Sequence, residues 1–340
     1  MRRAERPASA EACAELLRAC AGERHTVRVR GGGTKDHQGP RRDTDVVLET
    51  GALDGIVDHV PEDLTVTVRA GTPFGALRES LRAHGQFLPL DPPHVDRGAT
   101  VGGIIAANSE GFGRYRYGGV RDLLLGIRAA LPDGTVARAG GRVVKNVAGY
   151  DLNKLFIGSL GTLGVVVEAT FKILPIPPVT RAASATFASA GEAFAAADAL
   201  VRTSLRPIAT VVERTAERRW RLVLAAAGEA APVERAMTEL ARVAGARGAT
   251  PEAHDDVEQL LGPLRELVDQ TTRGSVVRVA LPLSAQAAFA ESAVRSDRDA
   301  RIVADAASGI ALVQLREEAA VDGLLAGARV LGGSGRIERT

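Results

Sequence analysis

Residues 99–119 read ATVGGIIAANSEGFGRYRYGG, a run dominated by glycines and other small residues. Gly102 and Gly103 lie two and three residues after Thr100, and the glycines continue as far as Gly119. Glycine has no Cβ and tolerates positive φ, so repeated glycines favour close approach of the backbone to another group. Small residues also allow tight helix packing, but packing alone does not explain so many glycines. We therefore expect a backbone cradle in this stretch.

A second glycine-rich segment, residues 30–35 (RGGGTK), lies earlier in the chain. It follows the alternating residues 26–30, which are typical of a strand, so the glycines begin where a strand ends. Three consecutive glycines can present successive N–H groups to phosphate oxygens, although an ordinary turn fits the same letters. The segment lacks the patterns of a P-loop and of a dinucleotide-binding βαβ unit. The two cradles together suggest a phosphate-bearing cofactor.

The composition sets the broad class of protein. A chain of 340 residues predicts two domains with separate cores. Its 43 basic and 41 acidic side chains leave a net charge of only +2, which does not favour nucleic acid or an anionic membrane as partner. No apolar run approaches the length of a membrane span. We expect a cytoplasmic protein that reaches a membrane only through partners and does not insert into it.

Cys13 and Cys20 are the only cysteines. Both fall in an expected helix, where seven residues of rise separate them by roughly 10 Å, so we do not expect a disulfide. No cluster of cysteines or histidines has the spacing of an iron–sulfur or metal site. Any further redox centre is therefore expected on another chain.

Periodicity predicts mixed helices and strands in the first half. A helix over 9–21 begins at a Ser9 cap, and a strand over 64–69 precedes a helix that ends at Gly85. Pro132-Asp133-Gly134 predicts a hairpin turn, and 165–174 predicts a long strand. The three prolines of 175–178 then mark the boundary between domains 1–176 and 177–340.

The second half predicts one order of elements twice, as two βαββα sets that build an antiparallel sheet with helices on one face. The fold class is therefore α+β, with an α/β cap as the second domain. The predicted strands are 181–187, 208–213, 220–226, 275–281, 301–305 and 309–313, and the predicted helices are 190–203, 232–247, 284–294 and 317–330.

A third element makes a family resemblance specific. Residues 145–152 (KNVAGYDL) are followed by residues 158–166 (GSLGTLGVV). In this order, the three elements resemble the FAD-binding PCMH-type domain of the vanillyl-alcohol-oxidase and p-cresol-methylhydroxylase superfamily. Within that superfamily they are most similar to the FAD-binding subunit of bacterial glycolate oxidase. The resemblance covers roughly residues 25 to 178 and implies a two-subdomain FAD-binding domain followed by a cap.

The resemblance also implies which residues hold FAD. Residues 30–35 would wrap the pyrophosphate, residues 100–103 and Asn108 would line its second side, and 165–166 would meet the adenosine portion through the backbone. Asp91-Pro92-Pro93 would approach the flavin ring, although Pro93 stands where the family pattern favours glycine. The implied cofactor-binding residues are Arg30, Gly31, Gly32, Gly33, Thr34, Lys35, Asp91, Pro92, Thr100, Gly102, Gly103, Ala106, Asn108, Gly111, Gly118, Gly164, Val165 and Val166.

Some relatives attach FAD covalently through a histidine in the first cradle. Thr34 occupies that position here, so we expect dissociable FAD, and we interpret His37, three residues later, as a loop residue.

No residue is identifiable as the base that oxidation of an alcohol requires. The histidines of metal-assisted relatives and their GDGN-type segment are missing, and His254 lies in a charged stretch typical of a solvated surface. Tyr150 and Lys154 follow a cofactor motif, which does not establish a catalytic role. Five arginines of the second domain could meet a substrate carboxylate or form a solvated surface: Arg181, Arg214, Arg218, Arg219 and Arg221.

Three functions follow from the resemblance and stay open. The first is an FAD-dependent oxidoreductase that forms part of a multi-subunit 2-hydroxy-acid dehydrogenase of the glycolate oxidase type, with catalytic and iron–sulfur subunits as partners. The second is a stand-alone flavin oxidase or dehydrogenase of a small alcohol or hydroxy acid. The third is a flavin-binding subunit without turnover. The substrate, electron acceptor and oligomeric state are not readable from the sequence.

Overall fold

The computed structural model describes residues 3–38, 43–141, 151–270 and 274–339. The chain forms two compact units, one made of Met1–Gly111 with Gly118–Ile176 and the other of Phe112–Tyr117 with Pro177–Thr340. The chain passes from one unit to the other between Ile176 and Pro177, inside the predicted proline-rich boundary. Earlier in the chain, residues 112–117 also belong to the second unit, so the chain enters that unit and returns to the first. The sequence did not predict this excursion.

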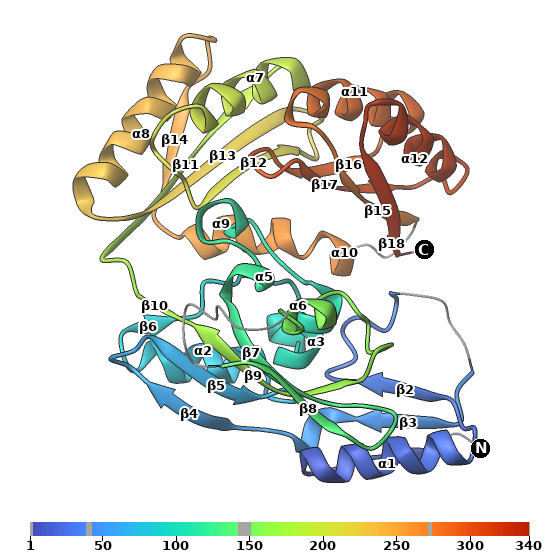
Figure 1. Ribbon diagram of the computed structural model, residues 1–340. Helices are drawn as coiled ribbons and strands as arrows, with labels where there is room; N and C mark the ends of the chain where they lie inside the picture. The colour runs from blue at the N-terminus through green and yellow to red at the C-terminus, as the bar shows by residue number, and fades with distance from the viewer. Residues whose placement is uncertain (1–2, 39–42, 142–150, 271–273, 340) are drawn as a thin grey trace. The chain divides into compact units, whose positions relative to one another are not determined.

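The first unit holds a small parallel sheet and a larger antiparallel one (Figure 1). The small sheet has the order β1-β3-β2, and the larger sheet has the order β4-β5-β9-β7-β8. This unit also contains a two-stranded antiparallel sheet, β10-β6. The strands are β1 (Arg3–Glu5), β2 (Val27–Arg30), β3 (Val46–Glu49), β4 (Ile56–Val60), β5 (Thr65–Arg69), β6 (Gln86–Phe87), β7 (Leu124–Ala130), β8 (Val136–Gly140), β9 (Val165–Lys172) and β10 (Leu174–Pro175).

Helix α1 (Ala10–Gly22) begins where the sequence predicts. The Ser9 side chain accepts a hydrogen bond from the Ala12 N–H at 3.0 Å, which satisfies one of the free donors of the first turn. Its buried face places Cys13 and Leu17 in one core with Val165 and Val167 of β9. This core joins the small sheet to one face of the larger sheet.

Helices α2 (Phe74–Arg82) and α3 (Val101–Ala107) contribute to the core on the other face of the larger sheet. Thr100 caps α3 by accepting a hydrogen bond from Gly103 N–H at 3.3 Å, and Asn108 ends it in the left-handed conformation with φ 47°. The buried Ile104 and Ile105 fix the rotation of α3, so its glycines and alanines are available for another surface. The remaining short helices of this unit are η1 (Thr50–Ala52), η2 (Val95–Arg97), α5 (Val120–Leu123) and α6 (Asn153–Phe156).

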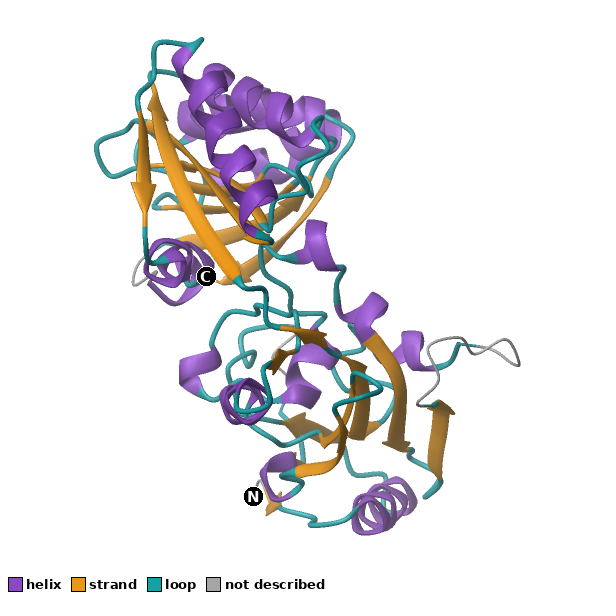
Figure 2. Cartoon of the chain, turned by 90° about the vertical axis from the view of Figure 1, so that its left-hand side faces the viewer, coloured by secondary structure: helices purple, strands orange, loops and turns teal. Residues whose placement is uncertain are grey.

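The second unit is built on one antiparallel sheet of eight strands, ordered β14-β11-β13-β12-β16-β17-β15-β18. Four helices cover one face of the sheet (Figures 1 and 2). The same order of elements occurs twice, and the two halves meet where β12 pairs with β16. The strands are β11 (Val179–Phe187), β12 (Ala209–Arg214), β13 (Trp220–Gly228), β14 (Pro251–His254), β15 (Ser275–Ala280), β16 (Arg301–Asp305), β17 (Ile310–Leu315) and β18 (Ser334–Arg339), and the covering helices are α7 (Ala190–Val201), α8 (Ala230–Gly245), α11 (Gln286–Ser296) and α12 (Ala320–Val330).

The opposite face of this sheet has its own small core. Phe112, at the start of the excursion that includes α4 (Arg114–Tyr117), is buried there with Val211, Val223 and Leu264. Burying a phenylalanine among aliphatic side chains stabilises the segment by roughly 2 kcal/mol, which explains why residues 112–117 lie with this unit. Two further helices of this unit are α9 (Val257–Arg265) and α10 (Leu267–Gln270), and η3 (Leu283–Ala285) precedes α11.

The predicted mixture of helices and antiparallel strands is confirmed. The sequence did not predict β14, β18, α9 or α10. The two strands lie at the edges of the sheet and are short and polar, so they lack the alternation of a half-buried strand. Helix α9 contains Pro263, a residue that normally marks the end of a helix.

Candidate cofactor site

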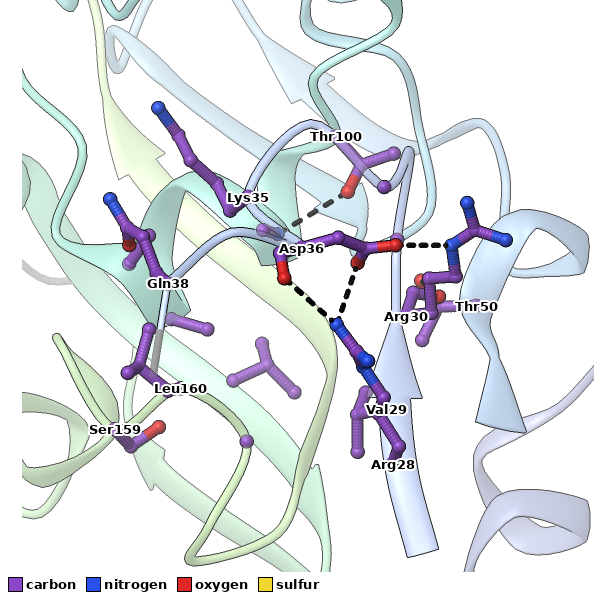
Figure 3. Close-up of a pocket in the computed structure, with 18 of the residues that line it drawn as sticks. Arg28, Val29, Arg30, Lys35, Asp36, Gln38, Thr50, Thr100, Ser159 and Leu160 are labelled. Carbon is purple, nitrogen blue, oxygen red and sulfur yellow. Dashed lines mark hydrogen bonds and ion pairs between the residues drawn. The ribbon is translucent and has the colours of Figure 1, made fainter. Parts of the chain in front are cut away.

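The first unit contains a cavity of about 470 Å³ formed by the segments that the sequence singled out (Figure 3). The first cradle follows β2, the second cradle lies on α3, and the third segment leads into β9. The predicted residues that line it are Arg30, Gly31, Gly32, Gly33, Thr34, Lys35, Thr100, Gly102, Gly103, Ala106, Gly164 and Val166.

The two cradles touch each other. A Cβ built on Gly31 would lie 2.3 Å from the Oγ1 atom of Thr100, and one on Gly32 would lie 1.9 Å from the carbonyl oxygen of Gly98. Both positions need glycine: Gly31 packs against the Thr100 side chain, and Gly32 packs against the backbone of residues 98–99. The close approach expected from the sequence is therefore, in part, an approach of one cradle to the other.

Gly102 and Gly103 differ in what surrounds them. A Cβ on Gly102 would lie 2.8 Å from the Cβ of Ala70, so this glycine lets α3 pack against the end of β5. A Cβ on Gly103 would meet only the Thr100 Oγ1, at 3.1 Å. Since Gly103 lines the cavity, it leaves backbone open toward a ligand without being required for packing.

The third segment is fastened to the second cradle by the backbone. Gly158 N–H donates to the Ile105 carbonyl at 3.0 Å, and Leu160 N–H donates to the Ala106 carbonyl at 2.8 Å. Leu160 takes positive φ, at 51°, which is uncommon for a residue with a branched side chain. These bonds hold residues 158–161 along the end of α3 and so close one wall of the cavity.

Two buried polar atoms at this wall have no hydrogen-bond partner within the part of the chain that the structure describes. They are Ser159 Oγ, which lines the cavity, and Asn108 Oδ1 at the end of α3. Buried polar groups in native proteins are nearly always hydrogen-bonded, and an exception needs an explanation. A ligand with hydroxyl or N–H donors would satisfy both atoms.

Charged side chains close another side of the cavity. Arg28 and Arg30 of β2 both pair with Asp36 (Figure 3). Behind them, Glu49 lies 3.8 Å from Arg30 and also pairs with Arg6. All five side chains are at least partly exposed, with Glu49 the least so. The cluster has three positive and two negative charges.

Six predicted residues do not line this cavity: Asp91, Pro92, Asn108, Gly111, Gly118 and Val165. The Val165 side chain lies in the core beneath α1, since neighbouring residues of a strand face opposite ways. Gly111 packs against Asp91, where a Cβ would lie 2.0 Å from the Asp91 carbonyl oxygen.

The cavity also contains residues that the sequence analysis did not name as cofactor contacts. Four of them, residues 159–162, belong to the third segment of the family resemblance, and the signal of the others was their position next to the glycine segments. They are Val27, Arg28, Val29, Asp36, Gln38, Thr44, Thr50, Ala107, Ser159, Leu160, Gly161 and Thr162.

The arginines considered for a substrate carboxylate are mostly engaged within the second unit. Arg214 is buried and donates to the Ala300 carbonyl at 2.8 Å. Arg218 pairs with Asp299 at 2.8 Å, and Arg221 pairs with Glu213. Arg181 donates to the carbonyl of Thr180 at 3.0 Å, and Arg219 is exposed.

The other candidate side chains also have structural contacts. Lys154 donates to the Leu124 carbonyl at 3.3 Å, and His254 is hydrogen-bonded to Ser184 at 2.8 Å. His37 packs edge-on against the buried His94, with ring centroids 6.3 Å apart. Tyr150 and the rest of residues 145–150 lie outside the described residues.

In the described ranges, no group of three or more His, Cys, Asp or Glu side chains is placed to hold a metal ion. The described helices likewise include none that is both long and apolar enough to span a bilayer.

Comparisons with known proteins define the class. Residues 3–140 match the FAD binding domain family, so the chain carries an FAD binding domain. Solved structures of the PCMH-type superfamily share its fold over 97% of the chain: p-cresol methylhydroxylase has a TM-score of 0.78 at 18% identity and is covered over 80% of its own chain. Alkyldihydroxyacetonephosphate synthase has a TM-score of 0.78 at 15% identity, with 72% of its chain covered. The predicted fold class and the predicted FAD cofactor are confirmed.

The chain is also similar in sequence to several curated oxidoreductases. The chain is 39% identical to the glycolate oxidase subunit GlcE of Escherichia coli, over 49% of this chain and 47% of GlcE. It is 35% identical to the glycolate oxidase subunit GlcD of Bacillus subtilis, over 52% of this chain and 37% of GlcD. The identity to D-lactate dehydrogenase [cytochrome] 1 of Saccharomyces cerevisiae is 35%, over 58% of this chain and 34% of that protein. The matches thus span about half or less of each curated relative.

Proposed function

We propose that the chain is an FAD-dependent oxidoreductase of a small 2-hydroxy acid, acting as the FAD-binding subunit of a glycolate-oxidase-like dehydrogenase. The observation that carries the proposal is the cavity in which all three predicted glycine segments meet. The similarity to glycolate oxidase subunits and to a D-lactate dehydrogenase supports the substrate class.

The residues present fit an elongated, phosphate-bearing ligand. The N–H groups of residues 31–35 would bind the pyrophosphate, with Gly103 opening the second side. Ser159 Oγ and Asn108 Oδ1 would accept hydrogen bonds from the cofactor's hydroxyl or N–H groups. Val166, one of the two residues expected to meet the adenosine portion, would contact it together with the neighbouring Gly164. Asp91, Pro92, Gly111 and Gly118 would support the flavin end of the site from outside the cavity.

Bound FAD would supply the acceptor for the hydride of a hydroxy acid. The chain's own contribution, in this proposal, is to hold the cofactor by backbone contacts and to keep its pyrophosphate away from water. We propose that the hold is noncovalent, because Thr34 cannot form the bond that a histidine forms in some relatives.

Partner subunits are part of the proposal. GlcE and GlcD are named as subunits of glycolate oxidase. We propose catalytic and iron–sulfur chains as the partners here, with association at a membrane only through them.

The test has two stages. The visible spectrum of the purified chain, before and after denaturation, should show a flavin that is released as free FAD. Glycolate and D-lactate are then added under anaerobic conditions, with and without co-expressed partner chains. Bleaching that requires the partners supports the subunit role, whereas bleaching by the chain alone supports a stand-alone enzyme. A chain that binds no FAD, or one that is never bleached under either condition, overturns the proposed activity.

A further inference from the structure

Arg30, the last residue of β2, holds the first cradle from one side. Its Nε atom lies 3.1 Å from the Oδ2 atom of Asp36 (Figure 3). Its Nη1 atom lies 3.8 Å from the Oε1 atom of Glu49. Asp36 lies beyond the glycines, so this ion pair closes the loop of residues 31–36 on itself.

The backbone of the loop lies against the same guanidinium. Gly33 has φ 73°, and a Cβ built on it would lie 2.7 Å from Nη2 and 3.2 Å from Cζ of Arg30. Glycine is required here for two reasons, the positive φ and the contact with the arginine. The loop therefore wraps around the Arg30 side chain.

Arg28, on the same strand as Arg30, also contacts Asp36. Its Nη2 atom donates to the Asp36 carbonyl oxygen at 3.1 Å and lies 3.4 Å from the Oδ1 atom of that residue. Residues two apart in a strand face the same side, so both arginines reach Asp36 together. Both the backbone and the side chain of Asp36 are thus fixed to β2.

The Arg30 side chain already has partners inside the chain. Its Nε atom pairs with Asp36, which Arg28 shares, and its Nη1 atom lies near Glu49, which also pairs with Arg6. An arginine committed in this way is poorly suited to serve as the direct counter-charge of a pyrophosphate.

We propose that Arg30 is a positioning residue of the cofactor site, which acts through Asp36 rather than by pairing with phosphate. The inference rests on the proposed binding of FAD in this cavity. The clamp fixes both ends of residues 31–35 in the shape that lines the cavity, so binding does not have to order the loop.

A double-mutant cycle on the apoprotein tests the clamp. The dissociation constant for added FAD is measured by flavin fluorescence for the original chain and for Arg30→Gln, Asp36→Asn and the double variant. We expect each single change to weaken FAD binding about five- to tenfold, and the double variant to be no weaker than the singles, because both remove one interaction.

Direct contact with phosphate gives the opposite sign at Asp36. Asp36→Asn would then free Arg30 and tighten FAD binding. Arg30→Gln would also weaken FAD binding by the same factor whether residue 36 is Asp or Asn. Arg30→Lys separates the two roles independently, because it keeps the charge but loses the planar fork. The clamp predicts weaker binding for this variant, and retained affinity would overturn the proposal.

Arg202→Gln is the matched control, since the exposed side chains of Arg202 and Asp198 pair at 2.7 Å at the end of α7 in the other unit. The unfolding temperature of each apoprotein is also measured. A variant that unfolds at the original temperature but binds FAD more weakly has kept its fold and has changed only the geometry of the loop. If the original chain binds no FAD, both the proposed function and the clamp fail. If it binds FAD and the Arg30 and Asp36 variants bind it equally well, the clamp alone fails.

Discussion

The α-carbon of Gly32 faces the carbonyl oxygen of Gly98 so closely that a Cβ would lie 1.9 Å from that oxygen. Gly32→Ala must therefore push the two cradles apart. We expect the apoprotein to lose about 1–3 kcal/mol of unfolding free energy, as overpacked sites do, and to retain much less FAD. Chemical denaturation and the ratio of flavin to protein absorbance measure both effects. Gly22→Ala is the control, because nothing lies near a Cβ there, and equal results for the two variants would contradict the contact.

Gly103 offers a cleaner test of the cavity than Gly102. A Cβ at Gly103, which lines the cavity, meets only Thr100 within 4 Å, whereas a Cβ at Gly102 lies 2.8 Å from the Cβ of Ala70. Because leucine favours helices more than glycine does, Gly103→Leu should leave the stability of the apoprotein unchanged or raise it. We expect its affinity for FAD to fall at least about tenfold, measured by flavin fluorescence on addition to the apoprotein. Full affinity would place the cofactor elsewhere.

Much of the fold was predictable because local chemistry marks it. Ser9 caps the first helix, and short runs of apolar residues, many of them β-branched, mark β9 and the strands of the second unit. Phe112 shows what local patterns miss. Its segment lies between glycines of the first unit in sequence, yet its burial with Val211 and Leu264 comes from contacts far away along the chain.

The segments that form the candidate site were predictable, but their contacts were not. Glycines in the sequence indicate that the backbone approaches another group closely without identifying that group, and in the structure Gly32 contacts Gly98. The pairing of Arg30 with Asp36 has no signature in the sequence, because many charged residues of a loop are simply solvated. An ion pair of this kind depends on the positions in space of the residues at the two ends of the loop. The sequence alone does not give those positions.

The cofactor should be released when the chain is denatured. Thr34 lacks a nucleophilic ring nitrogen, and the nearby His37 packs on His94 with ring centroids 6.3 Å apart. After acid precipitation we expect the yellow colour in the supernatant, with the chromatographic retention of FAD. Flavin that stays with the precipitated protein would indicate a covalent bond, and loss of that bond in His37→Gln would assign it.

Cys13 should be unreactive and should make stability depend on alkaline pH. Burial, with a smaller effect of Glu11, raises the pKa of its thiol from 9.0 to about 11. The folded state therefore holds the proton more tightly, so its stabilising effect is complete below pH 9 and is lost as the pH rises toward 11. Urea denaturation at pH 8 and at pH 10.5 should show a decline that is smaller in Cys13→Ala. Rapid labelling of the native Cys13 by a thiol reagent at pH 8 would contradict the burial.

Arg214 distinguishes a structural arginine from one that binds a substrate carboxylate. It is buried and donates to the Ala300 carbonyl at 2.8 Å, and burial lowers the pKa of its guanidinium. We expect Arg214→Met to lower the unfolding free energy by about 1–3 kcal/mol, because the Ala300 carbonyl loses its donor. Its FAD content should not change, since the residues of the cavity belong to the other unit. Arg219→Met is the exposed control, and urea denaturation compares the two. If Arg214→Met kept full stability but abolished bleaching by a hydroxy acid, the arginine would instead contact the substrate.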